Sequence, residues 1–117
     1  MSYDIELVHP VTKEVLVLEK PHFIQGGLYM QGGCNRCWLN VTYNYSKHYK
    51  SIGENGIRSI YGMSGAESIP VLKSAAEKLG DDVSDNYWEP TEGNAKTALL
   101  QLIALAQLRP DGIWAGD

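Results

Sequence analysis

His48 and the polar side chains just before it are the residues whose types and spacing best suit catalysis. His48 follows Tyr43, Asn44 and Tyr45 in the sequence. An imidazole beside polar aromatic groups can act as a general base. The sequence assigns it no serine or cysteine nucleophile with an orienting acid, because neighbours along the chain need not be neighbours in space. His48 is therefore the one catalytic candidate, and a surface or partly buried structural histidine is the alternative.

Cys34 and Cys37 form the only C-x-x-C pair of the chain. A zinc site needs a second pair or two suitably spaced histidines, and His9, His22 and His48 are too dispersed. A redox motif places the pair at the start of a helix, whereas here a strand-like run follows it. We therefore expect two reduced thiols at a hairpin turn, with no metal site and no cofactor.

Polar groups on one strand and at one helix start suggest a small-ligand site. Apolar and polar residues alternate over residues 38–45. Leu39 and every second residue after it are expected to face the core, while the asparagine amides face outward. The start of the last helix has unpaired N–H groups that attract anions, although Glu89 and Glu92 already satisfy them and plain capping is the alternative. The hypothesis uses four side chains: Asn40, Asn44, His48 and Lys96.

Acidic residues concentrate immediately before that helix. Between Leu79 and Ala95 there are five acids and no base, and the segment also holds Tyr87 and Trp88. One interpretation is a solvated connection between helices. The other is a surface for a basic protein partner, because tryptophan is enriched at binding hot spots. Its predicted interface residues include Asp85, Trp88 and Glu89.

The elements that must position these residues are strands first and helices second. Residues 3–7 alternate as a half-buried strand, and residues 15–18 are expected to pair with them in a hairpin. Two glycine pairs bound a further short strand at residues 28–30. Ser46 is expected to cap a short helix, and residues 57–61 to form another turn. Strands followed by helices predict an α+β fold, with an N-terminal antiparallel sheet of three to four strands packed against C-terminal helices.

Two longer helices are predicted in the second half of the chain. The first places Ile69, Leu72 and Leu79 on one face, with Gly80 as its stop. It begins either at a Ser64 capping box or at Ser68, and Pro70 favours a break or kink near Ser68.

The last helix runs from about residue 91 to residue 108 and is apolar on most sides. Leu100, Leu105 and Leu108 fall outside its main stripe, so either this chain or a second copy must cover them. Together with Trp114 after the helix, they complete the predicted interface, and a homodimer is one reading.

Length and composition restrict the class of protein. The chain has 117 residues with 44% apolar content, which predicts one domain over residues 1–117. Its net charge is −4 and its bases are scattered, so nucleic acid is not an expected partner. We find neither a secretory signal pattern nor an apolar run of membrane-spanning length, and therefore expect a cytoplasmic protein away from the membrane.

Three segments resemble small uncharacterised proteins of phages and mobile elements of Gram-positive bacteria: residues 61–70, 86–96 and 109–114. That resemblance covers nearly the whole chain, brings no catalytic residues with it, and implies an accessory role in a bacterial host cell. The leading hypothesis is thus a non-enzymatic accessory protein that binds an unidentified protein partner. The alternative is a nucleotide- or metabolite-binding protein or hydrolase that uses the face formed by Asn40, Asn44 and His48.

Overall fold

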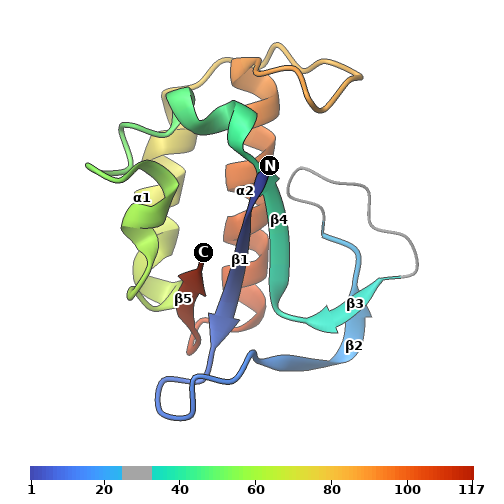
Figure 1. Cartoon of the computed structure of the whole chain (residues 1–117), viewed down its shortest axis with the longest axis vertical. Helices are drawn as coiled ribbons and strands as arrows, with labels where there is room; N and C mark the ends of the chain where they lie inside the picture. Colours follow the sequence, from blue (N-terminus) through green and yellow to red (C-terminus); the bar gives the residue numbers. More distant parts are fainter. Residues whose placement is uncertain (25–32) are drawn as a thin grey trace.

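The computed structural model describes residues 1–24 and 33–117 and has an α+β fold, as predicted. Its main sheet has the strand order β4-β1-β5, with β1 (Ser2–Val8) in the centre. Both neighbours, β4 (Trp38–Thr42) and β5 (Ile113–Gly116), run antiparallel to it. Figure 1 shows the three strands side by side, with the last strand of the chain next to the first.

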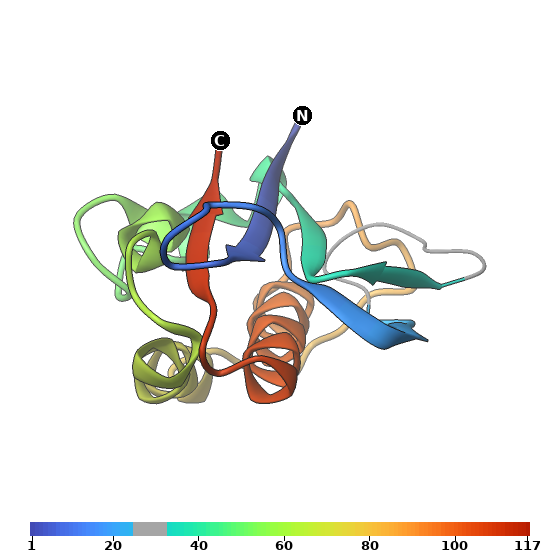
Figure 2. The same ribbon diagram turned by 90° about the horizontal axis from the view of Figure 1, so that it is seen from below.

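Two helices cover one face of this sheet. Helix α1 (Gly65–Glu77) and helix α2 (Glu92–Leu108) pack against each other on the same side, as Figure 2 shows in an end view. Alternate residues of the central strand, Ile5 and Leu7, are fully buried. The core between sheet and helices also contains Leu39, Val41, Leu72, Leu99, Leu102 and Trp114.

A second, smaller sheet replaces part of the predicted N-terminal hairpin. β2 (Val17–His22) pairs antiparallel with β3 (Cys34–Arg36). In the described residues, the predicted pairing of residues 15–18 with residues 3–7 is limited to the end next to the turn. An isolated bridge joins Val8 to Val15, and the N–H of Leu16 donates to the carbonyl of Leu7 at 2.9 Å. The edges of β1 are instead occupied by β4 and β5. The predicted strand at residues 28–30 lies outside the described residues.

The predicted strand at residues 38–45 is shorter than expected and continues as a 3₁₀ helix. β4 ends at Thr42, whose Oγ1 accepts a 3.2 Å hydrogen bond from the N–H of Asn44. This cap starts η1 (Tyr43–His48), so Thr42 rather than Ser46 is the capping residue. A second 3₁₀ helix, η2 (Gly56–Ile60), falls within the region where a turn was predicted.

The start of α1 corrects another prediction. Ser64 and Glu67 form a reciprocal capping box, each backbone N–H donating to the other side chain at 3.0 Å. Pro70 lies inside a helix that continues to Glu77, so the expected break near Ser68 is absent. The helix ends shortly before Gly80.

The predicted last helix is confirmed. α2 begins after Thr91, whose Oγ1 accepts a 3.0 Å hydrogen bond from the N–H of Asn94, and it ends at Leu108. The described residues contain no helix with the length and apolarity needed to cross a membrane.

Candidate functional site

The acidic segment, here called the acidic loop (residues 81–91), is held at its first half by the start of α2. Asp82 accepts a 3.0 Å hydrogen bond from the N–H of Gly93. The side chain of Asn94 accepts another of 3.0 Å from the N–H of Ser84. Lys96 forms an ion pair of 2.8 Å with Asp81. Since these bonds come from the first residues of one helix, they fix the loop to a rigid element.

The second half of the loop is held by η1. Asn44 Nδ2 donates to the carbonyl of Trp88 at 2.8 Å, and His48 Nε2 donates to the carbonyl of Pro90 at 2.7 Å. The hydroxyl of Tyr45 donates to the carbonyl of Tyr87. A carbonyl can only accept, so the proton of His48 is on Nε2 when this bond forms. These contacts turn three backbone carbonyls of the loop toward the protein.

Asn94 joins both halves of the loop. It is 5% exposed, and its Nδ2 donates to the carbonyls of Asn86 and Glu89 at 3.1 and 2.9 Å. Its Oδ1 accepts from the N–H of Ser84, so both the nitrogen and the oxygen of the side-chain amide form hydrogen bonds with the loop. The loop is therefore irregular in shape but fully tied to the body of the protein at its centre.

Gly93 lets the loop approach the helix closely. A Cβ atom at this position would lie 2.6 Å from the backbone carbon of Asp82 and from the backbone nitrogen of Val83. Real Cβ contacts are not that short, and backbone atoms cannot rotate away. The glycine is thus needed for contact rather than for an unusual backbone angle.

Apolar side chains project from this ordered loop among the acids. Trp88 is 41% exposed and Val83 is 64% exposed. The ring of Trp88 lies 4.8 Å from that of Tyr87, measured between centroids. Asp85 and Glu89 are exposed on the same loop. The loop therefore presents exposed acids together with a partly exposed indole.

The predicted ligand-binding residues do not form one site. Asn44 and His48 bind carbonyls of the acidic loop, and Lys96 binds Asp81. Asn40 lies on β4, where its Nδ2 donates to Ser2 Oγ at 2.7 Å and to Asp4 Oδ1 at 2.9 Å. Asn40 therefore belongs to the outer face of the sheet, while the other three belong to the support of the loop.

Two of the predicted interface residues are covered by this chain. Leu105 is fully buried and Trp114 is 1% exposed. Leu100 and Leu108 are each 48% exposed. Of these two, Leu100 lies two turns after Gly93 on the same side of α2, because seven residues make almost two full turns. Leu108 lies at the opposite end of the helix, about 24 Å from its first residue at 1.5 Å per residue.

The cysteine pair lies at the junction of two strands rather than in the expected hairpin turn, because Cys34 begins β3 and Cys37 directly precedes β4. Both thiols are free; Cys37 is fully buried, and burial raises its pKa. Because the thiolate is the reactive form, a raised pKa disfavours redox and metal chemistry at Cys37. Residues 1–24 and 33–117 contain no cluster of three or more histidine, cysteine, aspartate or glutamate side chains that could hold a metal ion.

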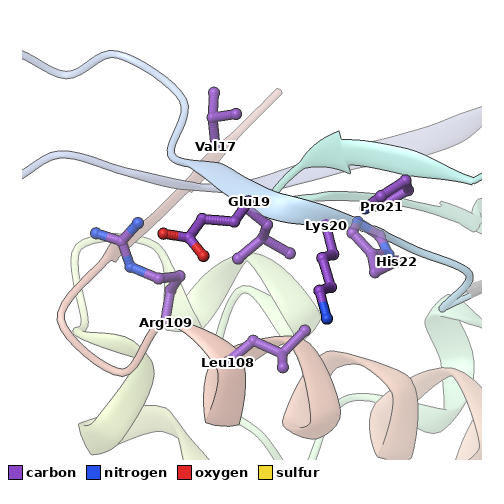
Figure 3. Close-up of a pocket in the computed structure, with 8 residues that line it drawn as sticks. Val17, Glu19, Lys20, Pro21, His22, Leu108 and Arg109 are labelled. Carbon is purple, nitrogen blue, oxygen red and sulfur yellow. The ribbon is translucent and has the colours of Figure 1, made fainter.

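A pocket that the sequence did not reveal lies between β2 and the C-terminal end of α2 (Figure 3). Its volume is about 490 Å³, and its lining includes Leu108 and Arg109 of the helix end. The strand contributes six consecutive residues, from Val17 to His22. In the sequence, only the irregular order of apolar and charged residues at positions 17–22 marked this segment.

Comparison with known proteins gives no assignment: no family model matches the chain, and neither a curated protein nor a solved structure matches it.

Proposed function

We propose that this protein acts by binding a basic protein partner through the acidic loop, and that it is an accessory protein rather than an enzyme. The observation that supports this most directly is the anchoring of the loop by side chains of η1 and α2. An ordered loop loses little conformational freedom on binding, so more of the contact energy appears as affinity. Loops held on a rigid scaffold commonly carry binding residues.

The proposed surface combines charge with exposed apolar groups. Asp85 and Glu89 would attract a basic partner and speed its association, while Trp88 would supply buried contact area. Val83 and Leu100 extend the apolar part toward the side of α2. Trp114 and Leu105 are left out of this surface because they are buried.

The ligand-binding alternative is less well supported at the predicted face. A ligand that used the side chains of Asn44 and His48 would have to replace their hydrogen bonds to the loop carbonyls. The resemblance to phage and mobile-element proteins fits an accessory role, with a phage or bacterial protein as the partner.

Affinity capture with matched charge variants tests the proposal. Immobilised wild type, Trp88→Ala, Asp85→Lys and the control Glu14→Lys are exposed to bacterial lysate, and a recovered protein is then purified and titrated. Glu14 is exposed and far from the loop in sequence, and its substitution changes the net charge as much as Asp85→Lys does. We expect Trp88→Ala and Asp85→Lys to weaken binding about tenfold or more, as at a hot spot. Glu14→Lys should bind like wild type.

The proposal fails if all three variants bind the partner equally, or if wild type retains nothing that Trp88→Ala does not. Light scattering of the wild type, Leu100→Ser and Leu108→Ser measures self-association separately. A dimer that either serine variant dissociates would make the second face of α2 an interface between copies. A monomer at all concentrations would leave both leucines open to a different partner.

A further inference from the structure

The pocket between β2 and the end of α2 has the size and the lining of a small-molecule site. Its volume of about 490 Å³ lies in the range of roughly 300–1,000 Å³ that is usual for ligand sites. Its lining residues belong to β2 and to the C-terminal end of α2. Figure 1 shows this end of α2 opposite the acidic loop, so the pocket is separate from the surface proposed above. Its residues make no contribution to the anchoring of that loop.

An irregularity in β2 explains why neighbouring side chains enter the same pocket. In a regular strand, successive side chains point to opposite faces. Here the pairing register with β3 shifts between Val17 and His22. Figure 3 shows Lys20 extending from the strand toward Leu108 of α2, whereas Glu19 turns toward the side of Arg109. The shift thus places an acid and a base together on one wall.

His22 is a structural part of the wall. It is 6% exposed, its Nε2 donates to the carbonyl of Arg36 at 2.7 Å, and its Nδ1 accepts from the N–H of Ile24 at 3.3 Å. Both ring nitrogens are therefore used, in the neutral tautomer. The polar groups open to a ligand are on Glu19, Lys20 and Arg109.

These three groups offer charges of both signs. Arg109 is fixed by a fork to Asp111, with Nε and Nη2 at 3.0 and 2.8 Å from the two carboxylate oxygens. The guanidinium has five N–H donors, so this fork leaves others free. Across the described ranges, Glu19 and Lys20 make no ion pair. A ligand can therefore meet an acceptor and two donors in one pocket.

The remaining wall is apolar and partly open. Leu108 is 48% exposed, and Leu18 is a further apolar residue of the lining, while the side chain of Val17 points away from α2 (Figure 3). Covering such side chains stabilises a complex by about 25 cal/mol for each Å² of apolar surface removed from water. The pocket consequently favours a ligand with an apolar part as well as charged groups.

We propose that this pocket binds a small zwitterion with an apolar side chain, the chemistry of a free apolar α-amino acid. The ligand carboxylate is bound by Lys20, its ammonium by Glu19, and its side chain by Leu108. A purely anionic ligand would meet the carboxylate of Glu19, and a purely cationic one would meet two positive charges. Only a ligand with both charges is matched by the whole lining.

Titration with three related probes tests each half of this recognition. Leucine carries both charges, N-acetyl-leucine only the carboxylate, and leucinamide only the ammonium. At about −0.3 kcal/mol per non-hydrogen atom, leucine is expected to bind with a dissociation constant of about 10 mM, which suits NMR titration of backbone amides. We expect saturable shifts at residues 17–22 and 108–109 with leucine, and about tenfold weaker binding of the other two, which corresponds to about 1.4 kcal/mol.

Variants assign the two charges of the ligand. Glu19→Gln should weaken the binding of leucine and leucinamide but leave the binding of N-acetyl-leucine unchanged. Lys20→Gln should weaken the binding of leucine and N-acetyl-leucine but leave the binding of leucinamide unchanged. Glu14→Gln and Lys73→Gln, both at exposed positions elsewhere, are the matched controls and should bind like wild type.

Three outcomes would overturn the proposal: no saturable shift with leucine, equal binding of all three probes, or shifts confined to residues outside the pocket. Because the variants do not touch the acidic loop, failure here leaves the proposed protein-binding function unaffected.

Discussion

The indole Nε1 of Trp114 donates a 2.7 Å hydrogen bond to the hydroxyl of Ser68, and this bond joins the last strand to the first long helix. Trp114 is 1% exposed and Ser68 is fully buried. The same hydroxyl donates to the carbonyl of Gly65 at 2.8 Å. A serine in the second turn of α1 is therefore the partner of a core tryptophan that lies 46 residues later.

Ser68→Ala should destabilise the protein by about 1–3 kcal/mol, because it leaves the buried N–H of Trp114 without an acceptor. Urea unfolding followed by circular dichroism measures this. Ser74→Ala, at an exposed position of the same helix, is the control and should change stability by less than about 0.5 kcal/mol. A double variant, Ser68→Ala with Trp114→Phe, should lose clearly less than the sum of the two single losses. Strict additivity would mean that the bond contributes nothing.

The capping box predicts how α1 responds to acid. Hydrogen bonding from Ser64 lowers the pKa of Glu67 from its ordinary value of 4.5. Because the folded state binds this proton less tightly, the carboxylate contributes stability above the unfolded pKa, and the contribution is lost as pH falls through the folded pKa. We expect Glu67→Gln, which keeps an amide oxygen for the cap, to be less stable than wild type at pH 7.

The difference in unfolding free energy between wild type and Glu67→Gln should shrink to zero on acidification below that folded pKa. Glu77→Gln, at an exposed position in the last turn of the same helix, should show no such convergence. A pH-independent difference for Glu67→Gln would contradict the role of its charge.

The buried hydroxyl of Tyr61 should make the stability of the protein depend on pH in alkaline solution. Burial, followed by the charge of Asp117, raises the pKa of Tyr61 from 10.0 to about 12. Its hydroxyl is buried and makes no hydrogen bond with the described residues. Above pH 10 an unfolded tyrosine loses its proton while the folded Tyr61 keeps it, so stability falls as pH rises from 10 toward 12.

Tyr61→Phe should therefore be neutral or stabilising at pH 7, and its stability should fall less steeply between pH 10 and 12 than that of wild type. Removing a buried hydroxyl that lacks a partner relieves up to about 1–3 kcal/mol of desolvation cost. Thermal unfolding across this pH range provides the measurement. A clear loss of stability at pH 7 would show that the hydroxyl does have a partner.

Local signals in the sequence predicted those elements whose ends are marked by nearby residues. The boundaries of α2 follow from the cap at Thr91 and from the residues 109–112 that end it. The burial of Leu39 and Val41 in β4 follows from their alternation, whereas Asn40 and Thr42, which the same pattern places on the outer face, are also buried. In each case the residues that decide the structure lie within one element.

Contacts between distant segments were the source of the errors. β5 pairs with β1 across more than 100 residues, and nothing near residues 3–7 reveals that partner. The local sequence favours a helix start at Ser68, but the role of this serine depends on Trp114. The helical pattern predicts that Leu105 lies outside the buried stripe, yet it is fully buried within the core cluster. The pocket depends on a register shift in β2 that an alternation pattern does not contain.

Gly93 offers a test of the close contact between the acidic loop and α2. Alanine is favoured over glycine in helices by about 1 kcal/mol, so a gain is expected if space allows. Because its Cβ would meet the backbone at 2.6 Å, we expect Gly93→Ala instead to destabilise the protein by about 1–3 kcal/mol through overpacking. Gly80→Ala, whose Cβ would meet ordinary contacts of 3.6 Å or more, should be tolerated. A stabilised Gly93→Ala would show that the loop can move away.

The double variant Asn44→Ala with His48→Ala separates the order of the loop from its charge. It removes the bonds to the carbonyls of Trp88 and Pro90 but keeps the acids and the tryptophan in the sequence. If these anchors hold the loop, amide hydrogen exchange at residues 81–90 should become faster while exchange in α1 stays unchanged. Lys47→Ala, at an exposed position between the two anchors, should leave loop exchange as in wild type.

The same variant should bind a captured partner more weakly, by about 0.5–1.5 kcal/mol for each side chain that must be ordered again on binding. Dissociation should account for most of this loss, because the charges that guide association are unchanged. Faster exchange with unaltered affinity would mean that the rigidity of the loop does not contribute to binding, and that only its acidic and aromatic side chains do.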